Sequence, residues 1–267
     1  MSFIIIRCGS AARGDTNSNS DTDTVCIWEG IKPNFTEIKK TYKGIMFYSS
    51  DTIRRMRKMN SLFLTHLDID GIYLAGNKNL TKLYKGFKPD SISLQKNSHT
   101  TKEFIREIKW YPNNIHGMLW IMDVLYVATR NIIFCENAIK GNFIFGYEAA
   151  LNAFGLRDAE IQSMLKIREG KYDYRKNNPR YTHCQDSHFL SETASMITGL
   201  HISLTAGGKT SFDRSKNYNY WTERLIERAI INNEINAPHY ITAMKNHNYN
   251  KTKLKIETKK LILQLTP

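Results

Sequence analysis

Near the N-terminus, two aspartates have the spacing of a metal-binding pair. Asp21 and Asp23 are separated by one residue and directly precede the apolar run 25–28. Residues i and i+2 of a β-strand point to the same face, so the two carboxylates would lie side by side. Two like charges that close repel each other unless a cation lies between them. Hard oxygen ligands suit Mg²⁺, and the pair therefore predicts a magnesium site.

A glycine–serine turn precedes this acidic pair. Gly9 and Ser10 follow the apolar run 3–6, which is rich in β-branched isoleucine and predicts a strand. The turn has little side-chain bulk, so its backbone N–H groups, and those of a helix beginning near Ala11, would be able to bind phosphate oxygens. The sequence thus places a phosphate-binding turn and a metal-binding pair between two predicted strands.

Together these residues resemble the signature of the DNA polymerase β-like nucleotidyltransferase superfamily, in the form found in minimal nucleotidyltransferases and aminoglycoside adenylyltransferases. The matching residues are Gly9, Ser10, Arg13, Gly14, Ser20, Asp21 and Asp23. The alternative is a polar hairpin loop that carries an acidic pair by chance.

The resemblance implies an enzyme that moves a nucleotidyl group from an NTP, such as ATP, or a dNTP to an acceptor hydroxyl and releases pyrophosphate. Its cofactor would be Mg²⁺ or Mn²⁺, held by the catalytic residues Asp21 and Asp23. The predicted nucleotide-binding residues are Gly9, Ser10, Arg13 and Ser20.

A second stretch, residues 61–74, is similar to a segment that recurs in minimal nucleotidyltransferases. The superfamily normally has a third carboxylate on a neighbouring strand, but the predicted strand 45–48 contains no acid. Asp70 is therefore the predicted third catalytic carboxylate, as a metal ligand or as the base for the acceptor hydroxyl. The other candidates are Asp68, Glu103 and Glu107. Alternatively, Asp70 only forms the turn before Gly71.

Composition and charge narrow the class of partner. The 267 residues are 41% hydrophobic and 24% charged, as in a soluble globular protein, with a net charge of +13. Such a basic balance favours a polyanionic partner such as nucleic acid, although a solvated Lys- and Asn-rich surface is the alternative. It makes a cationic aminoglycoside the least favoured acceptor.

Cysteine spacing and hydropathy point to a cytoplasmic protein without a membrane partner. The four cysteines lie far apart and lack C-x-x-C spacing, which predicts reduced thiols. The longest apolar run, 118–127, contains Asp123 and is too short to span a bilayer. The opening run of four apolar residues does not have the form of a signal peptide.

The order of predicted elements indicates an α+β fold. We expect a small mixed β-sheet nucleotidyltransferase domain over residues 1–112 and an α-helical bundle domain with a basic tail over 113–267. The predicted helices cover residues 34–43, 51–59, 115–139, 147–154, 159–170, 187–200 and 220–233. Thr100 to Glu103 predict a further helix start.

Three charged features allow two interpretations each. Asp123 and Arg130 share a helix face and predict a buried pair or a pocket lining. The basic cluster of the helix at 51–59 predicts an exposed face or an anion-binding surface; its members are Arg54, Arg55, Arg57 and Lys58. In the lysine-rich tail 251–265, apolar residues alternate with polar ones in a way that favours an edge strand over a basic amphipathic helix. Its lysines either bind along a phosphate backbone or belong to a strand at the sheet edge.

The resemblance leaves the acceptor open among a nucleic-acid 3′ end, a nucleotide, a protein hydroxyl and a small antibiotic. Relatives often act in bacterial toxin–antitoxin or anti-phage operons, so we expect synthesis or extension of an oligonucleotide in bacterial defence. The alternatives are an adenylyltransferase that modifies a co-encoded partner protein, or a degenerate module that only binds a nucleotide or a partner.

Overall fold

The computed structural model describes residues 2–16, 19, 23–177, 186–212, 219–245 and 251–265. Ser20 and Asp21 lie outside the described residues. Contacts group the chain into two compact units: unit 1 is Met1–His99 with Ile133–Leu156, and unit 2 is Thr100–Ile132 with Arg157–Pro267. The predicted domain boundary after residue 112 is a single cut, whereas the contacts divide the chain at three places.

Unit 1 contains a small mixed sheet with strand order β3-β2-β1-β4. The strands are β1 (Phe3–Cys8), β2 (Asp23–Trp28), β3 (Met46–Ser49) and β4 (Ile72–Gly76). β1 pairs antiparallel with both β2 and β4, and β2 pairs parallel with β3. The predicted strands at 3–6, 25–28 and 45–48 are confirmed, because β-branched and aromatic residues alternate between two buried faces.

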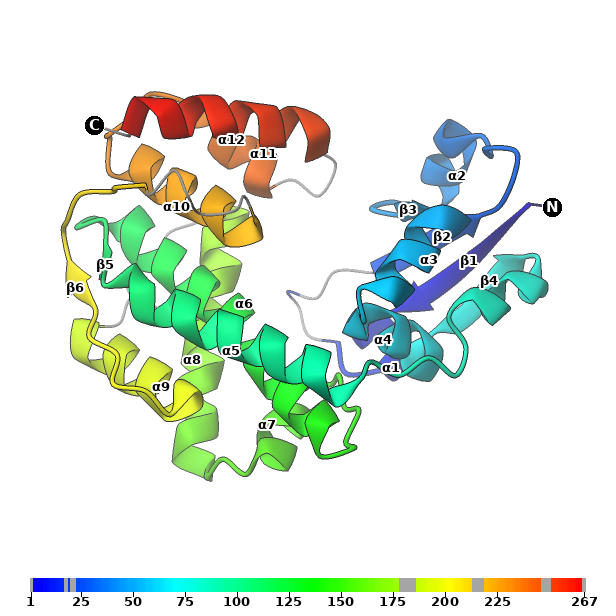
Figure 1. Cartoon of the computed structure of the whole chain (residues 1–267), viewed down its shortest axis with the longest axis horizontal. Coiled ribbons are helices and arrows are strands. Elements are labelled where there is room, and N and C mark those ends of the chain that lie inside the picture. The colour runs from blue at the N-terminus through cyan, green and yellow to red at the C-terminus, as the bar shows by residue number, and fades with distance from the viewer. Residues whose placement is uncertain are drawn as a thin grey trace. The chain divides into compact units, whose positions relative to one another are not determined.

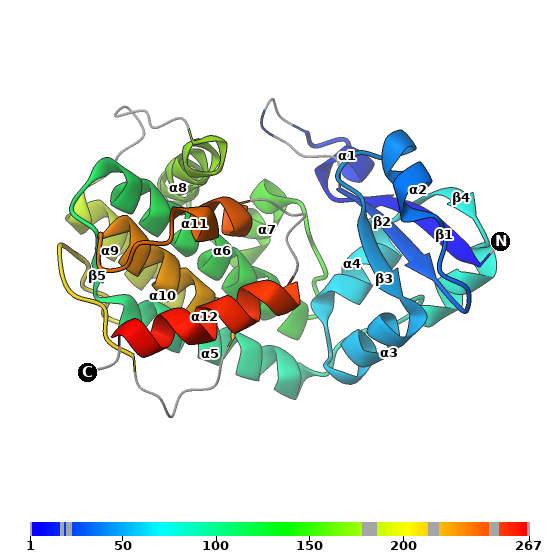
Figure 2. The same cartoon turned by 90° about the horizontal axis from the view of Figure 1, so that it is seen from above.

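Helices cover both faces of this sheet (Figure 2). The helices that lie wholly in unit 1 are α1 (Ser10–Arg13), α2 (Phe35–Thr41), α3 (Ser50–Lys58), α4 (Leu62–Asp70), η1 (Lys78–Leu83) and α7 (Tyr147–Phe154). One face buries Ile4, Ile6 and Val25 against residues of α3, α4 and η1. The opposite face buries Ile5 and Cys26 beneath α2.

Helix α5 (Ser91–Ile108) shows that the helix start predicted at Thr100 is wrong. The helix is continuous from Ser91, and its polar residues 98 and 101 lie in its interior. Both are buried, at 2% and 6% exposure. Ser98 Oγ donates to Glu136 Oε1 at 2.7 Å. This hydroxyl therefore bonds a side chain of another helix and does not cap a helix N-terminus.

Unit 2 is mostly helical, and the chain as a whole is a mixed sheet followed by a largely helical region (Figure 1). Its elements include the second half of α5 and most of α6 (Ile115–Ile139). The others are β5 (Trp110–Tyr111), α8 (Asp158–Lys176), α9 (Ser187–Thr198), β6 (Thr205–Ala206), α10 (Tyr220–Ile231), α11 (Pro238–Lys245) and α12 (Lys251–Leu265). β5 and β6 form a short parallel pair.

Helix α6 is confirmed at its predicted bounds and is largely buried. Among the described residues it is the one helix long and apolar enough to cross a membrane, but 78% of its most apolar window is buried inside the protein. A core helix of a soluble protein has this character. Gly170 of α8 lies against Met122, where a Cβ atom would come within 2.4 Å of the Met122 side chain, so glycine permits the close approach of α8 to α6.

The C-terminal tail is a helix, so the predicted strand is wrong. Leu254, Thr258 and Leu261 of α12 are buried, which is the 3.6-residue period of a helix rather than strand alternation. The misleading residue is Thr258, whose hydroxyl is buried in contact with Tyr240 Oη at 2.7 Å and with the carbonyl of Leu254 at 2.8 Å. A polar residue on the buried face hid the helical pattern.

The interpretation of Asp123 and Arg130 as a buried pair is also corrected. The ion-pair partners found for Asp123 are Arg175 of α8 and Arg224 of α10, at 2.8 and 2.7 Å. These arginines are 52 and 101 residues away along the chain. The spacing of residues within α6 therefore could not have predicted them.

Candidate active site

The candidate site lies where β1 ends and β2 begins. Cys8 and Asp23 are paired residues of the antiparallel ladder, so the turn after Cys8 faces the carboxylate of Asp23. Gly9 has φ +71°, and a Cβ atom there would lie 2.5 Å from Asp23 Oδ2. Glycine is therefore needed twice at this position, for its left-handed backbone and for the space that the carboxylate occupies. Asp23 itself is exposed.

Helix α1 begins directly at the turn. The amides of Ala12 and Arg13 donate to the carbonyl of Gly9 at 3.1 and 3.2 Å. Gly14 ends the helix in the left-handed conformation, with its amide bonded to the carbonyl of Ser10 at 2.9 Å. This single turn of helix fixes the direction in which the Arg13 side chain leaves the backbone.

Arg13 lies at the centre of a charged network in unit 1. Its Nη1 donates to Asp70 Oδ2 at 2.8 Å, and its Nε donates to Asp15 Oδ2 at 3.1 Å. His66 Nε2 lies 3.3 Å from Arg13 Nη1 and 3.1 Å from Asp70 Oδ2. The network joins the Gly-Ser turn to the end of α4, which supplies His66 and Asp70 from adjacent turns.

The network shifts the pKa values of its members. Burial alone would raise the pKa of Asp70, but the hydrogen bonds from His66 and Arg13 outweigh it and lower that pKa. Burial would lower the pKa of Arg13, and its hydrogen bonds to Asp70 and Asp15 reverse the effect. Arg13 therefore stays a cation and Asp70 an anion at neutral pH.

Burial and the charge of Asp23 also raise the pKa values of two neighbouring groups, Cys8 and Tyr48. Burial raises the pKa of the Cys8 thiol to about 12, and the charges of Asp23 and Asp70 add to that rise. The pKa of Tyr48 is raised by burial, by Cys8 and by Asp23. Cys8 is thus an inert thiol beneath the site rather than a nucleophile.

A later stretch of the chain completes the network. Phe145 packs against the His66 ring, with centroids 4.6 Å apart and planes inclined by 32°. A Cβ atom at Gly146 would lie 3.1 Å from Asp15 Oδ2 and 3.6 Å from Arg13 Nε. Both residues belong to the segment Ile133–Leu156 of unit 1. This segment therefore limits the positions open to His66 and Arg13.

The structure brings together most of the residues predicted for the site, and it adds one. Gly9, Ser10, Arg13, Asp23 and Asp70 lie around the end of β1, whereas Ser20 and Asp21 lie outside the described residues. The added residue is His66, which sequence inspection placed only within a segment. Its spacing four residues before Asp70 on one helix was a readable signal of contact.

The alternative acids have other partners. Asp68 accepts a hydrogen bond from the amide of Gly86 at 2.8 Å, which ties the end of α4 to the loop after η1. Glu103 forms an ion pair with Arg106 on the surface of α5. Glu103 and Glu107 both belong to unit 2. Among these acids, Asp70 is the one that the structure joins to the Gly-Ser turn, through its hydrogen bond with Arg13.

The exposed carboxylate of Asp23 is a donor that fits Mg²⁺, because hard cations prefer carboxylate oxygens. Asp21, two residues earlier in the sequence, would supply a second donor of the same kind. Within the described residues there is no group of three or more His, Cys, Asp or Glu side chains that would hold a metal ion by themselves.

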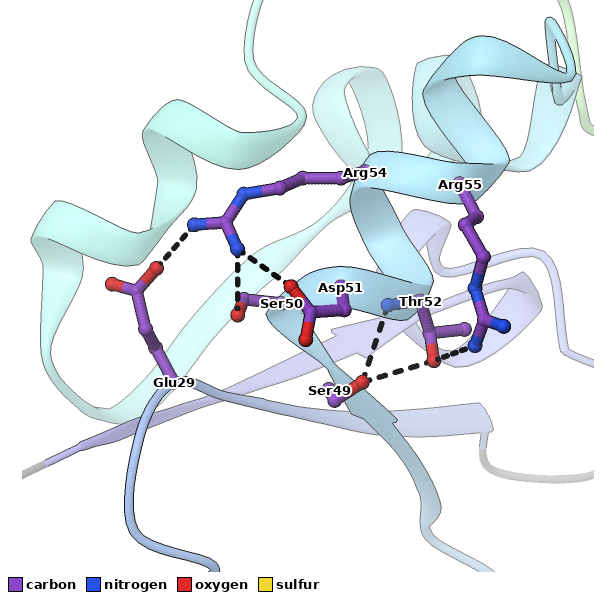
Figure 3. Close-up of polar contacts among 7 residues, drawn as sticks. All are labelled: Glu29, Ser49, Ser50, Asp51, Thr52, Arg54 and Arg55. Carbon is purple, nitrogen blue, oxygen red and sulfur yellow. Dashed lines mark hydrogen bonds and ion pairs between the residues drawn. The ribbon is translucent and has the colours of Figure 1, made fainter.

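The basic cluster of α3 forms an exposed helix face with local partners (Figure 3). Ser49 caps the helix, accepting from the amide of Thr52 at 3.2 Å. Arg54 bonds Glu29 at 2.5 Å and Asp51 at 2.9 Å, and Arg55 donates to the Thr52 hydroxyl at 3.2 Å. These contacts neutralise Arg54, so the exposed-face interpretation holds for it.

A scan against models of known protein families finds no match for the chain, and a search of curated sequences finds no significant relative. Function must therefore be inferred from the residues and their geometry. An exposed carboxylate, a glycine turn and a guanidinium on the next helix lie within one short stretch, and their chemistry suits a metal ion and phosphate.

Proposed function

We propose that this chain is a magnesium-dependent nucleotidyltransferase that moves an NMP or dNMP from a nucleoside triphosphate to an acceptor hydroxyl and releases pyrophosphate. The observation that carries the proposal is the juxtaposition of Asp23 and Gly9. The start of β2 bears the carboxylate, and the end of its neighbour β1 leads into a turn without side-chain bulk. The approach is so close that a Cβ atom at Gly9 would lie 2.5 Å from Asp23 Oδ2.

In the proposed mechanism the chain positions the triphosphate from two sides. The backbone amides of the turn at Gly9 and Ser10 would bind phosphate oxygens, and Arg13 would add a fixed positive charge nearby. Asp21 and Asp23 would hold the metal. When bound, Mg²⁺ neutralises phosphate charge and favours departure of pyrophosphate. The buried thiol of Cys8 lies below and takes no part.

Asp70 is the proposed third carboxylate of this site. Its hydrogen bonds with Arg13 and His66 and its lowered pKa support a positioning role, because a strongly paired carboxylate is a weak proton acceptor. Asp70 would hold Arg13 in the direction of the phosphates. Asp70 would then not be the base that removes the acceptor proton.

The net charge of +13 supports a polyanionic acceptor or product. We therefore favour synthesis or extension of an oligonucleotide, and we place it in bacterial defence because the N-terminal motif resembles enzymes of that setting. A protein hydroxyl is the second candidate acceptor.

The test is to incubate the purified protein with each labelled NTP and dNTP plus Mg²⁺ or Mn²⁺, first without an acceptor and then with RNA, DNA or candidate proteins. Products are resolved on a denaturing gel, and the protein is checked by intact mass. Asp23→Asn should remove all incorporation, while Asp51→Asn, an exposed aspartate of α3, should not.

Each outcome separates the candidates. A ladder indicates an oligonucleotide synthase, and a mass increment on protein indicates protein nucleotidylation. If the wild type binds a nucleotide but incorporates none with any acceptor, the chain is a binding module and the proposal fails. Activity that survives in Asp23→Asn would also overturn it.

A further inference from the structure

Helix α12 has an outer face that is neither purely polar nor buried. Its inner residues Leu254 and Leu261 are buried with residues of α10 and α11, beside which α12 lies in red in Figure 1. On its outer face, Ile256 is 52% exposed and Leu263 is 64% exposed. Two large aliphatic side chains one heptad apart on a solvent face are not explained by the fold of unit 2.

Lysines accompany these two aliphatic residues. The exposed ones are Lys253, Lys255, Lys259 and Lys260. The helix contains one acid, Glu257, which forms an ion pair with His239 of α11. The outer face of α12 therefore has a positive charge that surrounds an apolar pair.

The spacing of these residues is that of a coiled-coil seam. Lys253, Ile256, Lys260 and Leu263 follow one another at intervals of three, four and three residues. This is the alternation of a and d positions, with lysine at a and an aliphatic residue at d. Lys259 occupies the flanking g position, where charged residues select the partner helix.

We propose that the outer face of α12 is a docking site for an acidic amphipathic helix of a partner protein. Aliphatic residues of that helix, spaced by heptads, would cover Ile256 and Leu263. Its Asp and Glu side chains would pair with Lys260 at an a position and Lys259 at a g position, so the charges are complementary. Burial of the two aliphatic side chains supplies affinity, and the lysines supply partner choice.

The apolar pair distinguishes this partner from two others. A nucleic-acid backbone would use the lysines and leave Ile256 and Leu263 in water. A lipid surface would require a wider apolar face than two side chains, because membrane affinity grows with the apolar area that is buried. A second copy of this helix would place lysine against lysine.

The experiment uses the full chain and a labelled synthetic peptide of three heptads with leucine at a and d and glutamate at e and g. The glutamates prevent the peptide from pairing with itself at neutral pH. Fluorescence anisotropy measures binding without nucleotide, so the result is independent of any transferase activity. The expected result is saturable binding that weakens as salt is raised.

Variants then assign the surface. The double variant Ile256→Asp with Leu263→Asp should raise the Kd about tenfold or more, and Lys259→Glu with Lys260→Glu should do the same. Lys209→Glu, an exposed lysine elsewhere in unit 2, should leave the Kd unchanged. Circular dichroism should show all variants folded, because every substituted side chain is exposed.

The proposal is overturned if the peptide does not bind, or if the aspartate variants bind it as well as the wild type. It is also overturned if phosphatidylserine-containing vesicles or a single-stranded oligonucleotide bind in place of the peptide and the same variants abolish that binding. Those results would assign α12 to a lipid surface or to nucleic acid.

Discussion

Each unit contains a carboxylate held by two nitrogen-bearing side chains, and the two networks differ in their access to water. In unit 1, Asp70 contacts Arg13 and His66 at 2.8 and 3.1 Å. In unit 2, Asp123 contacts Arg175 and Arg224 at 2.8 and 2.7 Å. The distances are alike, but the Asp70 side chain is 9% exposed and that of Asp123 is 1% exposed.

The charged groups of the buried network of unit 2 bind mainly to one another. Arg224 forms ion pairs with both Asp123 and Glu227, each at 2.7 Å, and the Tyr174 hydroxyl donates a hydrogen bond to Glu227. Burial would lower the pKa of Arg224, but the charges of Glu227, Asp123 and neighbouring tyrosines raise it. The charges of Asp123, Arg224 and Glu227 lie almost wholly out of water and are stable only as a complete set, whereas Arg175 is partly exposed.

The network of unit 1 is more open. Arg13 is 21% exposed and its partner Asp15 is 43% exposed. A ligand can therefore compete for the guanidinium, which is the property required of a phosphate-binding group. Exposure of the carboxylates, rather than the number of ion pairs or the exposure of the arginines, separates the structural network of unit 2 from the candidate functional network of unit 1, because Arg175 of unit 2 is itself 31% exposed.

The largest effect should come from breaking the buried network. Asp123→Ala leaves Arg175 and Arg224 without their shared carboxylate and should lower the free energy of unfolding by about 3–5 kcal/mol. Urea unfolding followed by circular dichroism measures this loss. Glu37→Ala, which removes an exposed acid from α2, should cost less than about 1 kcal/mol. Equal losses in the two variants would contradict the structural role of Asp123.

A smaller effect on stability, with a larger effect on function, is expected at the turn. Gly9→Ala introduces a left-handed alanine and a contact of 2.5 Å with Asp23, for a cost of about 1–3 kcal/mol. Gly30→Ala is a matched control, because Gly30 has φ +70° with no atom within 4 Å of its Cβ position. The difference between the two variants in thermal unfolding and in nucleotide transfer measures what Gly9 contributes beyond its positive φ, namely the close approach of Asp23 and the ψ of −159° at Gly9. No difference would remove Gly9 from the site.

Asp70→Asn should cost about 1–2 kcal/mol at neutral pH, because a charge-assisted hydrogen bond is lost. The folded pKa of Asp70 is lowered, so its contribution is complete above the unfolded-state pKa of about 3.9 and disappears as pH falls through the folded value. The stabilities of the wild type and the variant should therefore converge in acid. Stability curves that stay parallel from neutral pH to below pH ~3 would exclude this linkage.

The smallest effect should follow from His66→Ala, since Arg13 and Asp70 keep their own hydrogen bond. We expect a loss of about 1 kcal/mol in stability or less. If His66 helps Asp70 to position Arg13, its loss should weaken nucleotide binding, measured as a higher KM with kcat less affected. His66→Gln, which can still hydrogen-bond, should recover part of the binding. An unchanged KM in both variants would leave His66 with a packing role against Phe145 only.

Much of the fold follows from the sequence, because it depends on local patterns. The strands at β1, β2 and β3 are apolar runs ended by Gly, Ser and Asp, and α6 has a long apolar pattern before Gly141. The errors arose where tertiary contacts decide. The interior polar residues of α5 imitated a helix start, and buried Thr258 concealed the helical period of α12.

The site divides in the same way. Gly9 and Asp23 were predictable because the motif is local and the two residues meet across adjacent strands. The contact of Arg13 with Asp70 spans 57 residues, and that of His66 with Phe145 joins α4 to a segment beyond α6. No period or cap in the sequence encodes which distant side chain will arrive there. Packing of the whole of unit 1 determines it.

The assembly of unit 1 from two separated segments has a consequence for biosynthesis. The sheet, the turn and α4 are complete once residue 76 has been made, yet Phe145 and Gly146 are synthesised only after α5 and α6. During translation the N-terminal part must therefore wait, with His66 and Arg13 uncovered, until that later segment leaves the ribosome. A nascent chain or a fragment that ends at residue 112 would contain the whole sequence motif but would lack the segment with Phe145 and Gly146 that packs against it.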